Sequence, residues 1–558
     1  MKPLRTQALA AHVFCSLLIS VLATSCVASG GYWIPPSSPP TPAALALAPQ
    51  IGLQSEDPPI VLLEASPTPS IPPAIPITIE PIDDPTSTAV SETPTQPPGE
   101  TFTSPTLLPP SATPEIYVVD TAPILYYAQA ADTLKVVAVR FGVTPAEITS
   151  PEPIPETAFI NPGQLLIIPR KLGNTTSSQQ IMPDSEVVYS PSAVNFDTLE
   201  FVRQAGGYLS SYKEWHKSTG MKSGAEIVQR VAIENSINPR LLLSLLEYHS
   251  HWVYGMPQGR EQTDYPMGLV LPNAKGLYNQ LVWSVNQLSI GYYAYREGRL
   301  TQIRFSDGAT ARLAPDLNAG TAALQYYFSK LYESQRWLDA LNPDVGLPAL
   351  HTTMFGNPWE RAKTVEPLFP AGVTQPQLIL PFMRNWTWSY TGGPHGAWEQ
   401  EGAYAALDFA PGSNESGCVQ SDAWATAAAA GLVVRTGPGL VVLDLDGDGY
   451  EQTGWVLVYL HIAEKGRVQL GDWVAAGDPI GRPSCEGGFA TGTHIHIARK
   501  FNGEWVPADG PLPFNLGGWV AHAGPMPYTG TLTRDGITLT ACTCSNYLTF
   551  ITRTDDDP

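Results

Sequence analysis

Histidine is the side chain that most readily both binds a metal ion and carries a proton near neutral pH. Half of the ten histidines in this 558-residue chain lie after position 390. His494 and His496 flank an isoleucine within an apolar run, so the alternation of a β-strand would place both imidazoles on one face. Two imidazoles about 7 Å apart on one face can bind a single metal ion.

Three more polar residues complete a set that suits hydrolysis at a metal ion. His395 follows a Gly-Gly-Pro turn, Asp408 lies in a strand-like run at 406–409, and His461 lies near the end of a second run at 456–462. Catalytic zinc takes three protein ligands and keeps a fourth position for water. Two histidines and one aspartate leave a single positive charge, which favours ionisation of that water. Two further histidines can accept its proton.

This constellation resembles the lysostaphin-like zinc metallopeptidases, whose pattern is a His and an Asp, a lone His after a strand, and then His-x-His. His395 and Asp408 are thirteen positions apart, which resembles the beta-lytic and staphylolysin branch. The two glycines before the first histidine and the aromatic residue after the aspartate agree with that branch. A glycine-rich hairpin at 471–481 also matches the family.

The resemblance implies an antiparallel all-β peptidase domain over residues 376–530 that binds Zn²⁺ and cleaves peptide bonds of cell-wall peptides. It implies that the metal ligands are His395, Asp408 and His496 and that the catalytic residues are His461 and His494. The alternative is an inactive member that binds the wall, although such members typically lose ligands and every position of the pattern is present here. Residues 531–558 are predicted to form a C-terminal tail.

Asp444, Asp446 and Asp448 resemble the start of a calcium-binding loop. An EF-hand needs an acidic residue at loop position twelve, which is Trp455 here. The Asp-Gly steps also suit a tight turn between two strands. We favour the turn, with calcium binding as the alternative.

Six cysteines are present, and export from the cytoplasm permits disulfides. The four beyond position 400 allow three full pairings. We expect Cys418 to pair with Cys485, which would close a loop of about 66 residues and contribute about 4 kcal/mol. Cys542 and Cys544 are two positions apart, an awkward span for a disulfide, and their ligation of zinc is an alternative.

Residues 195–365 are predicted to be helical, with an Asn-Pro helix start at 238–239. The order of segments resembles the lysozyme-like fold of lytic transglycosylases, in which a Glu followed by Ser protonates the glycosidic oxygen. The matching pair here is His249 and Ser250, and Glu247 is turned about 200° away around the helix. We therefore predict a non-catalytic domain. A shifted site at Glu247 and a coincidental likeness are the alternatives.

Residues 116–170 resemble the LysM domain, which consists of a strand, two helices and a strand. The resemblance rests on a helix expected at 134–141, a Pro-Gly-Gln turn at 162–164 and a strand expected at 165–168. Ala131 stands where the pattern usually has glycine. The resemblance implies binding to glycans that contain N-acetylglucosamine, with a degenerate spacer as the alternative. Residues 171–194 are predicted to be a linker.

The N-terminus has the features of a secretory signal. Lys2 and Arg5 precede an apolar run at 8–23 that is too short for a membrane span, and small residues lead to Cys26. Residues 1–26 resemble a signal with a bacterial lipobox, in which Cys26 becomes lipidated. Ordinary cleavage with an unmodified cysteine is the alternative. Both place the protein outside the cytoplasm, in the cell envelope, and the lipid would anchor it to the membrane.

Residues 27–115 are predicted to be a disordered proline-rich linker. The chain has 55 prolines, concentrated here, and no Lys or Arg lies between Cys26 and Lys135.

The net charge of the whole chain is −20, which argues against a general nucleic-acid binder and against electrostatic docking on anionic lipid.

The sequence therefore predicts a multidomain, exported peptidoglycan hydrolase. A zinc endopeptidase domain would cut cell-wall peptides while the LysM-like domain holds glycan. The alternatives are a non-enzymatic lipoprotein that binds the wall or regulates a hydrolase, and a bifunctional hydrolase with an active glycosidase domain.

Overall fold

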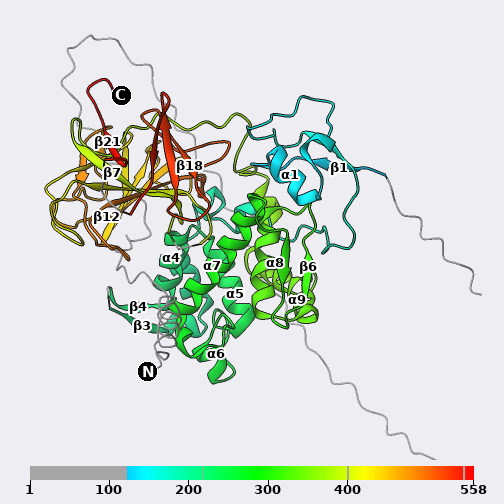
Figure 1. Ribbon diagram of the computed structural model, residues 1–558. Coiled ribbons are helices and arrows are strands. Elements are labelled where there is room, and N and C mark those ends of the chain that lie inside the picture. The colour runs from blue at the N-terminus through cyan, green and yellow to red at the C-terminus, as the bar shows by residue number, and fades with distance from the viewer. Residues whose placement is uncertain (1–121, 218, 399–400, 544–546, 558) are drawn as a thin grey trace, which may run out of the picture. The chain divides into compact units, whose positions relative to one another are not determined.

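The computed structural model describes residues 122–217, 219–398, 401–543 and 547–557, and they belong to one contact unit (Figure 1). The signal predicted at 1–26, the lipidation at Cys26 and the linker at 27–115 lie outside the described residues. Within the described part, no helix is long and apolar enough to cross a membrane.

A small domain of two strands and a helix begins the described chain. Strand β1 (Ile124–Tyr127) pairs antiparallel with β2 (Leu165–Ile168), and helix α1 (Leu134–Phe141) follows β1 in the chain. These bounds agree with the sequence expectation, but the second helix is only a 3₁₀ turn, η1 (Pro145–Glu147). Ala131 has a φ of 61°, a left-handed conformation that glycine adopts without steric cost.

A helical domain follows. Asn238 caps its α5 helix by accepting a hydrogen bond from Arg240 N, and Pro239 occupies the first helical position, as the sequence predicted. The helices are α2 (Thr198–Ala205), α3 (Tyr208–Ser211), α4 (Gly224–Asn235), α5 (Pro239–Ser250), α6 (Arg260–Asp264), α7 (Leu277–Arg296), α8 (Ala319–Leu331), α9 (Ser334–Leu341), α10 (Leu347–Phe355) and α11 (Pro358–Ala362).

Two features of this domain differ from the sequence expectation. The segment predicted as a linker at 171–194 packs into the helical core, where Ile181 and Met182 are buried and Ile181 N donates to the Thr321 hydroxyl. Two short hairpins interrupt the helices: β3 (Lys213–His216) with β4 (Gly220–Ser223), and β5 (Gln302–Arg304) with β6 (Thr310–Arg312). Strands of three or four residues have too little alternation to be recognised from hydrophobicity alone.

The C-terminal domain is built on antiparallel β-sheet, as predicted. Its main sheet has the order β13, β10, β11, β12, β15, β8, β7, β21, and β16 pairs with β15. The strands of this sheet are β7 (Thr387–His395), β8 (Ala406–Pro411), β10 (Gly431–Gly437), β11 (Gly439–Asp444), β12 (Trp455–Ile462), β13 (Trp473–Val474), β15 (Ile495–Phe501), β16 (Glu504–Trp505) and β21 (Phe550–Thr552).

Smaller sheets complete the domain. Strands β9 (Ala425–Thr426) and β14 (Pro479–Gly481) pair with each other. A separate sheet contains β17 (Asn515–Leu516), β18 (Trp519–Ala523), β19 (Gly530–Arg534) and β20 (Ile537–Thr540).

The described residues of the segment predicted as a tail, 531–543 and 547–557, are part of the fold. They supply most of β19, all of β20, and the edge strand β21, in which Ile551 pairs with Trp388 and is buried. Ile551 adds to the apolar core of the domain, which explains why this segment is ordered against the sheet.

The two faces of the main sheet pack against different partners. Ile495 and Ile497 face the core of the β domain itself, whereas Ala498 belongs to the core shared with the helices. The alternation therefore places His494 and His496 on the face opposite the isoleucines, as predicted for His-x-His.

Helix α7 contacts the β domain along this shared core. Trp505 N donates to the Tyr293 hydroxyl at 2.9 Å, and the guanidinium of Arg296 lies 2.7 Å from the buried carboxylate of Glu504. Arg299, just after α7, donates to the carbonyl of Gly402 at 3.1 Å, so the segment between His395 and Asp408 also contacts the helical domain.

Candidate metal centre

Three neighbouring strands place the side chains that the sequence assigned to a metal ion. His496 on β15 lies opposite Asp408 on β8, and Asp408 lies opposite Gly392 on β7. The potential ligand atoms of His395, Asp408 and His496 all lie within 4.8 Å of one another, and all three residues are buried. The structure thus brings together the set whose members are far apart in sequence.

Hydrogen bonds to backbone carbonyls decide which ring nitrogens carry protons in these histidines. Nδ1 of His395 donates to Gly393 O at 2.8 Å, and Nε2 of His496 donates to Ala397 O at 3.0 Å. A neutral imidazole has one N–H, so Nε2 of His395 and Nδ1 of His496 both present lone pairs. Outer-shell carbonyls fix metal-binding histidines in the same way.

The lone pairs converge on one point. Nε2 of His395 and Nδ1 of His496 are 3.0 Å apart, and each is 3.3 Å from Oδ1 of Asp408. This oxygen is buried without a well-formed hydrogen bond. Three acceptors so close together repel one another unless a cation lies among them, so the donor set fits a divalent metal such as zinc.

The glycine pair before His395 permits this approach of the strands. A Cβ on Gly392 would lie 2.5 Å from Oδ2 of Asp408, and a Cβ on Gly393 would lie 2.5 Å from Thr529 O. Contacts this short do not occur for real side chains, so each position requires glycine.

The two histidines expected to be catalytic lie beside this set. The ring centroids of His461 and His494 are 4.3 Å apart, and Nε2 of His494 is 3.9 Å from Oδ1 of Asp408. Nδ1 of His461 donates to Glu486 O at 2.9 Å, and Nδ1 of His494 donates to Gly492 O at 2.8 Å. Each ring therefore keeps Nε2 as a proton acceptor.

His461 occupies a strained position. It is the extra residue of a β-bulge, because Leu460 pairs with Leu440 and Ile462 pairs with Gly439, and its φ is 62°. A bulge changes the direction of a side chain, and non-glycine residues in this conformation concentrate at functional sites. Burial, together with the neighbouring histidines, lowers the pKa of His461 to about 3, so the ring is uncharged.

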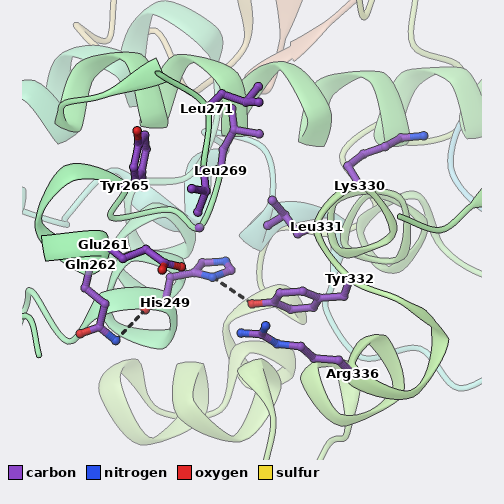
Figure 2. Close-up of a pocket in the computed structure, with 12 residues that line it drawn as sticks. His249, Glu261, Gln262, Tyr265, Leu269, Leu271, Lys330, Leu331, Tyr332 and Arg336 are labelled. Carbon is purple, nitrogen blue, oxygen red and sulfur yellow. Dashed lines mark hydrogen bonds between the residues drawn. The ribbon is translucent and has the colours of Figure 1, made fainter. Parts of the chain in front are cut away.

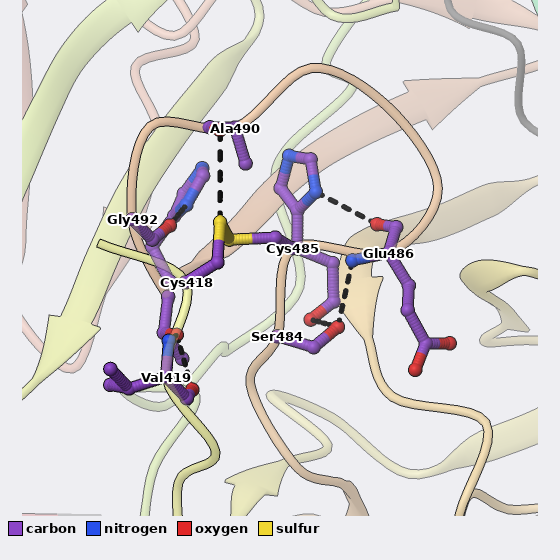
Figure 3. Close-up of a disulfide and its surroundings, with 10 residues drawn as sticks. Cys418, Val419, Ser484, Cys485, Glu486, Ala490 and Gly492 are labelled. Carbon is purple, nitrogen blue, oxygen red and sulfur yellow. Dashed lines mark hydrogen bonds between the residues drawn. A yellow bond between two sulfur atoms is a disulfide. The ribbon is translucent and has the colours of Figure 1, made fainter.

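A disulfide joins the two loops beside these histidines (Figure 3). Cys418 is bonded to Cys485, the pairing expected from the sequence. Ser484 N donates to His461 O at 2.7 Å, and Thr493 N donates to Gly417 O at 3.1 Å. The cross-link thus holds together the segments that fix both rings. Cys542 is also disulfide-bonded, with a partner outside the described residues, and Cys544 lies outside them too.

Tyr528 is a site residue that the sequence did not reveal. Its ring stacks on His395, with centroids 4.1 Å apart and an interplanar angle of 20°. Its carbonyl accepts from Gly393 N at 2.9 Å, and its φ is 67°. No motif surrounds it, so only the strained backbone and the contact with a candidate ligand identify it.

Asp444 ends β11, and Asp446 and Asp448 lie in the turn that follows, the interpretation favoured from the sequence. Their carboxylates gather within 4.8 Å of one another, but Asp444 accepts hydrogen bonds from Asp446 N at 3.2 Å and Gly449 N at 2.9 Å. Asp448 accepts from the Thr453 hydroxyl at 2.6 Å. These bonds close the connection between β11 and β12.

The helical domain contains a different histidine site, a cavity of about 460 Å³ lined by His249 (Figure 2). Both ring nitrogens of His249 are hydrogen-bonded, Nε2 to the Tyr327 hydroxyl at 3.0 Å and Nδ1 to the Tyr332 hydroxyl at 3.1 Å. Burial lowers the pKa of His249 to about 3, so it is uncharged and cannot serve as the protonating acid of a glycosidase.

Glu247 does not line this cavity. Its Oε2 accepts hydrogen bonds from Val253 N at 2.8 Å and Tyr254 N at 3.0 Å, so the carboxylate holds the segment that follows α5. This placement agrees with the expectation that Glu247 points away from the position of His249 around the helix. It disfavours a shifted active site at Glu247.

Comparison with known proteins shows that the chain is similar in sequence to a protease. A family model described as the LasA N-terminal domain matches residues 180–368, which cover the helical domain and the end of the segment predicted as a linker. Protease LasA of Pseudomonas aeruginosa is 27% identical over 354 residues, covering 58% of this chain and 78% of LasA. LasA of a second strain is 26% identical over 309 residues, covering 50% and 68%.

Solved structures of M23 peptidases are also similar to part of the chain. The M23 metalloprotease Pseudoalterin from the deep sea is 24% identical with a TM-score of 0.26, covering 31% of this chain and 96% of that chain. The catalytic domain of lysostaphin from Staphylococcus simulans is 24% identical with a TM-score of 0.16, covering 22% and 90%. The chain is therefore LasA-like in sequence, and the resemblances to LysM and lytic transglycosylase domains stay predictions.

Proposed function

We propose that this protein is an exported zinc-dependent endopeptidase that cleaves peptide bonds in peptidoglycan. The observation that carries the proposal is the convergence of unprotonated atoms of His395, Asp408 and His496 beside two histidines with acceptor nitrogens. The sequence likeness to Protease LasA supports a peptidase.

In this proposal, His395, Asp408 and His496 bind the metal. When bound, zinc supplies a Lewis acid that polarises a carbonyl and lowers the pKa of water. A water molecule would attack the peptide carbonyl, and Nε2 of His461 or His494 would accept the proton that this water loses. The protonated ring then stabilises the oxyanion and returns the proton to the leaving amine. The backbone carbonyls bonded to Nδ1 keep both rings aimed during this exchange.

The other parts of the chain would hold the enzyme on its substrate. The LysM-like domain at 116–170 would bind glycan. Leu125 and Tyr127 on β1 are 61% and 63% exposed, so their side chains offer apolar surface to a sugar ring. Lipidation at Cys26 would anchor the protein to the membrane outside the cytoplasm. Tethering raises the local concentration of substrate at the peptidase site.

The test is release of muropeptides from purified peptidoglycan by the full chain, with zinc content measured in the same preparation. Wild-type protein should bind about one zinc per chain at this site and release peptides, and His494→Ala should release far less. If both proteins release the same amount, the peptidase proposal fails and the wall-binding alternative is favoured.

A further inference from the structure

A second cavity, of about 310 Å³, lies beside the candidate metal centre. Its lining includes Ala410, which is two residues along β8 from Asp408, and Gly492 and Thr493, which directly precede His494. Strand residues advance about 3.4 Å each, so Ala410 and Asp408 share a sheet face about 7 Å apart. The cavity is therefore within reach of the substrate residues that flank the cleaved bond.

The charged side chains in this lining are acidic. They are Glu415 and Asp422, and the described residues that line the cavity include no Lys, Arg or His. The Asp422 carboxylate lies 3.9 Å from the guanidinium of Arg482, which partly neutralises it. Glu415 forms no ion pair with any described residue, so its charge is available to a ligand.

One further group in the lining suits a cation. Trp386 has half of its surface exposed, and the face of an indole attracts ammonium groups.

The wall that carries Glu415 is held in place before any substrate arrives. Cys418 is bonded to Cys485, and Val419 exchanges hydrogen bonds with the Thr493 hydroxyl, at 2.9 Å from its N and 2.5 Å from its O (Figure 3). A wall fixed in this way loses little conformational entropy on binding.

We propose that this cavity binds a primary ammonium group of the peptide substrate, on a residue near the cleaved bond. Glu415 supplies the opposite charge and Trp386 supplies the aromatic face. The inference rests on the proposed peptidase function and narrows it to peptides with a free amine, carried either on a side chain or at the N-terminus.

The test compares cleavage of peptides that differ only in that amine. The starting substrate is a lysine-containing peptide with a free N-terminus that the full-length protein cleaves. In one variant peptide the lysine is replaced by Nε-acetyllysine, and in a second the N-terminus is acetylated. Wild-type protein should prefer the free amine at one of these positions by about 3- to 10-fold in kcat/KM, mainly through KM. Glu415→Gln should reduce this ratio to about one. Asp535→Asn, which removes an exposed carboxylate that does not line the cavity, should leave the ratio unchanged.

Equal kcat/KM for free and acetylated peptides in the wild type would overturn the inference and leave the peptidase proposal standing, since cleavage is still observed. A preference that survives Glu415→Gln would also overturn it. If no peptide is cleaved, calorimetry with the same peptides decides. Tighter binding of the free amine that is lost in Glu415→Gln supports the cavity even as the peptidase proposal fails, and equal binding rejects both.

Discussion

The histidine site of the β domain and the His249 site of the helical domain differ in what their ring nitrogens do. In the β domain, backbone carbonyls hold one nitrogen each of His395 and His496 and leave the other pointing at Asp408. In the helical domain, tyrosine hydroxyls engage both nitrogens of His249. An imidazole with an open nitrogen can bind a cation or a proton, whereas one with both nitrogens satisfied contributes to packing.

The difference extends to the energy stored in each site. The β-domain site gathers acceptor atoms at about 3 Å, which is unfavourable until a cation lies among them. It also holds His461 at a φ of 62°, a costly conformation for a residue other than glycine. The helical site has its polar atoms paired, which stabilises the fold. Function and stability are thus separated between the two domains, and four substitutions can test that separation.

The largest effect is expected at a metal ligand. His496→Ala removes one of three ligands, so zinc content should fall to background and peptide release by about 10³-fold or more, because the metal contributes several kcal/mol to the reaction. Metal analysis and muropeptide release measure both.

The same variant also tests the stored energy. Without metal, His496→Ala leaves a cavity and an unpaired Ala397 O, but it also removes one of the converging acceptors. The metal-free variant should therefore lose less stability than the loss of about 2–5 kcal/mol that is typical of truncating a buried side chain, and a loss within that range would contradict the comparison.

A smaller loss of activity is expected for His494, which in the proposed function transfers protons and does not bind the metal. His494→Ala should keep zinc and lower kcat by about 10²- to 10³-fold, since a positioned general base contributes that much. Zinc content measured beside kcat separates this variant from the first. Loss of metal in His494→Ala would show instead that His494 is a ligand.

The contrast between the sites could be predicted only in part from the sequence. His494 and His496 could be placed on one face because strand alternation is local. The carbonyl partners of His496 and His461 could not be predicted, because Ala397 and Glu486 come from distant loops without a motif. Tyr528 was missed for the same reason.

The domain boundaries show the same limit. The helix at 134–141 and the strand at 165–168 follow from local patterns and were placed correctly. The segments at 171–194 and 531–558 have few local signals, and long-range packing of Met182 and Ile551 makes them part of the fold. Composition indicates how polar a segment is, whereas burial depends on which partner it meets.

In the helical domain, the expected effect is on stability and depends on pH. Burial lowers the pKa of His249 in the folded state from 6.5 to about 3. As pH falls, the folded state therefore takes up this proton at a lower pH than the unfolded state does. The stability from this group is complete above about pH 6.5 and is lost as pH falls toward 3, by about 2 kcal/mol between pH 7 and pH 5.

Removing the ring should remove this dependence. His249→Gln keeps a polar partner for the tyrosines but does not titrate. The difference in unfolding free energy between wild type and His249→Gln should therefore shrink by about 2 kcal/mol from pH 7 to pH 5 in urea titrations. A difference that stays constant with pH would mean that burial does not lower the pKa of His249 and that the ring titrates alike in the folded and unfolded states.

The smallest effect is expected when one of the two hydrogen bonds of the His249 ring is removed. Tyr332→Phe deletes the hydroxyl that lies 3.1 Å from Nδ1 of His249 and keeps the ring that packs in the core. Tyr327 can still hold Nε2, so stability should fall by only about 1 kcal/mol at pH 7, measured by urea unfolding, and peptide release should change by less than about twofold. A loss of peptide release that matches His494→Ala would connect the helical cavity to catalysis and would remove the distinction between an open and a satisfied histidine.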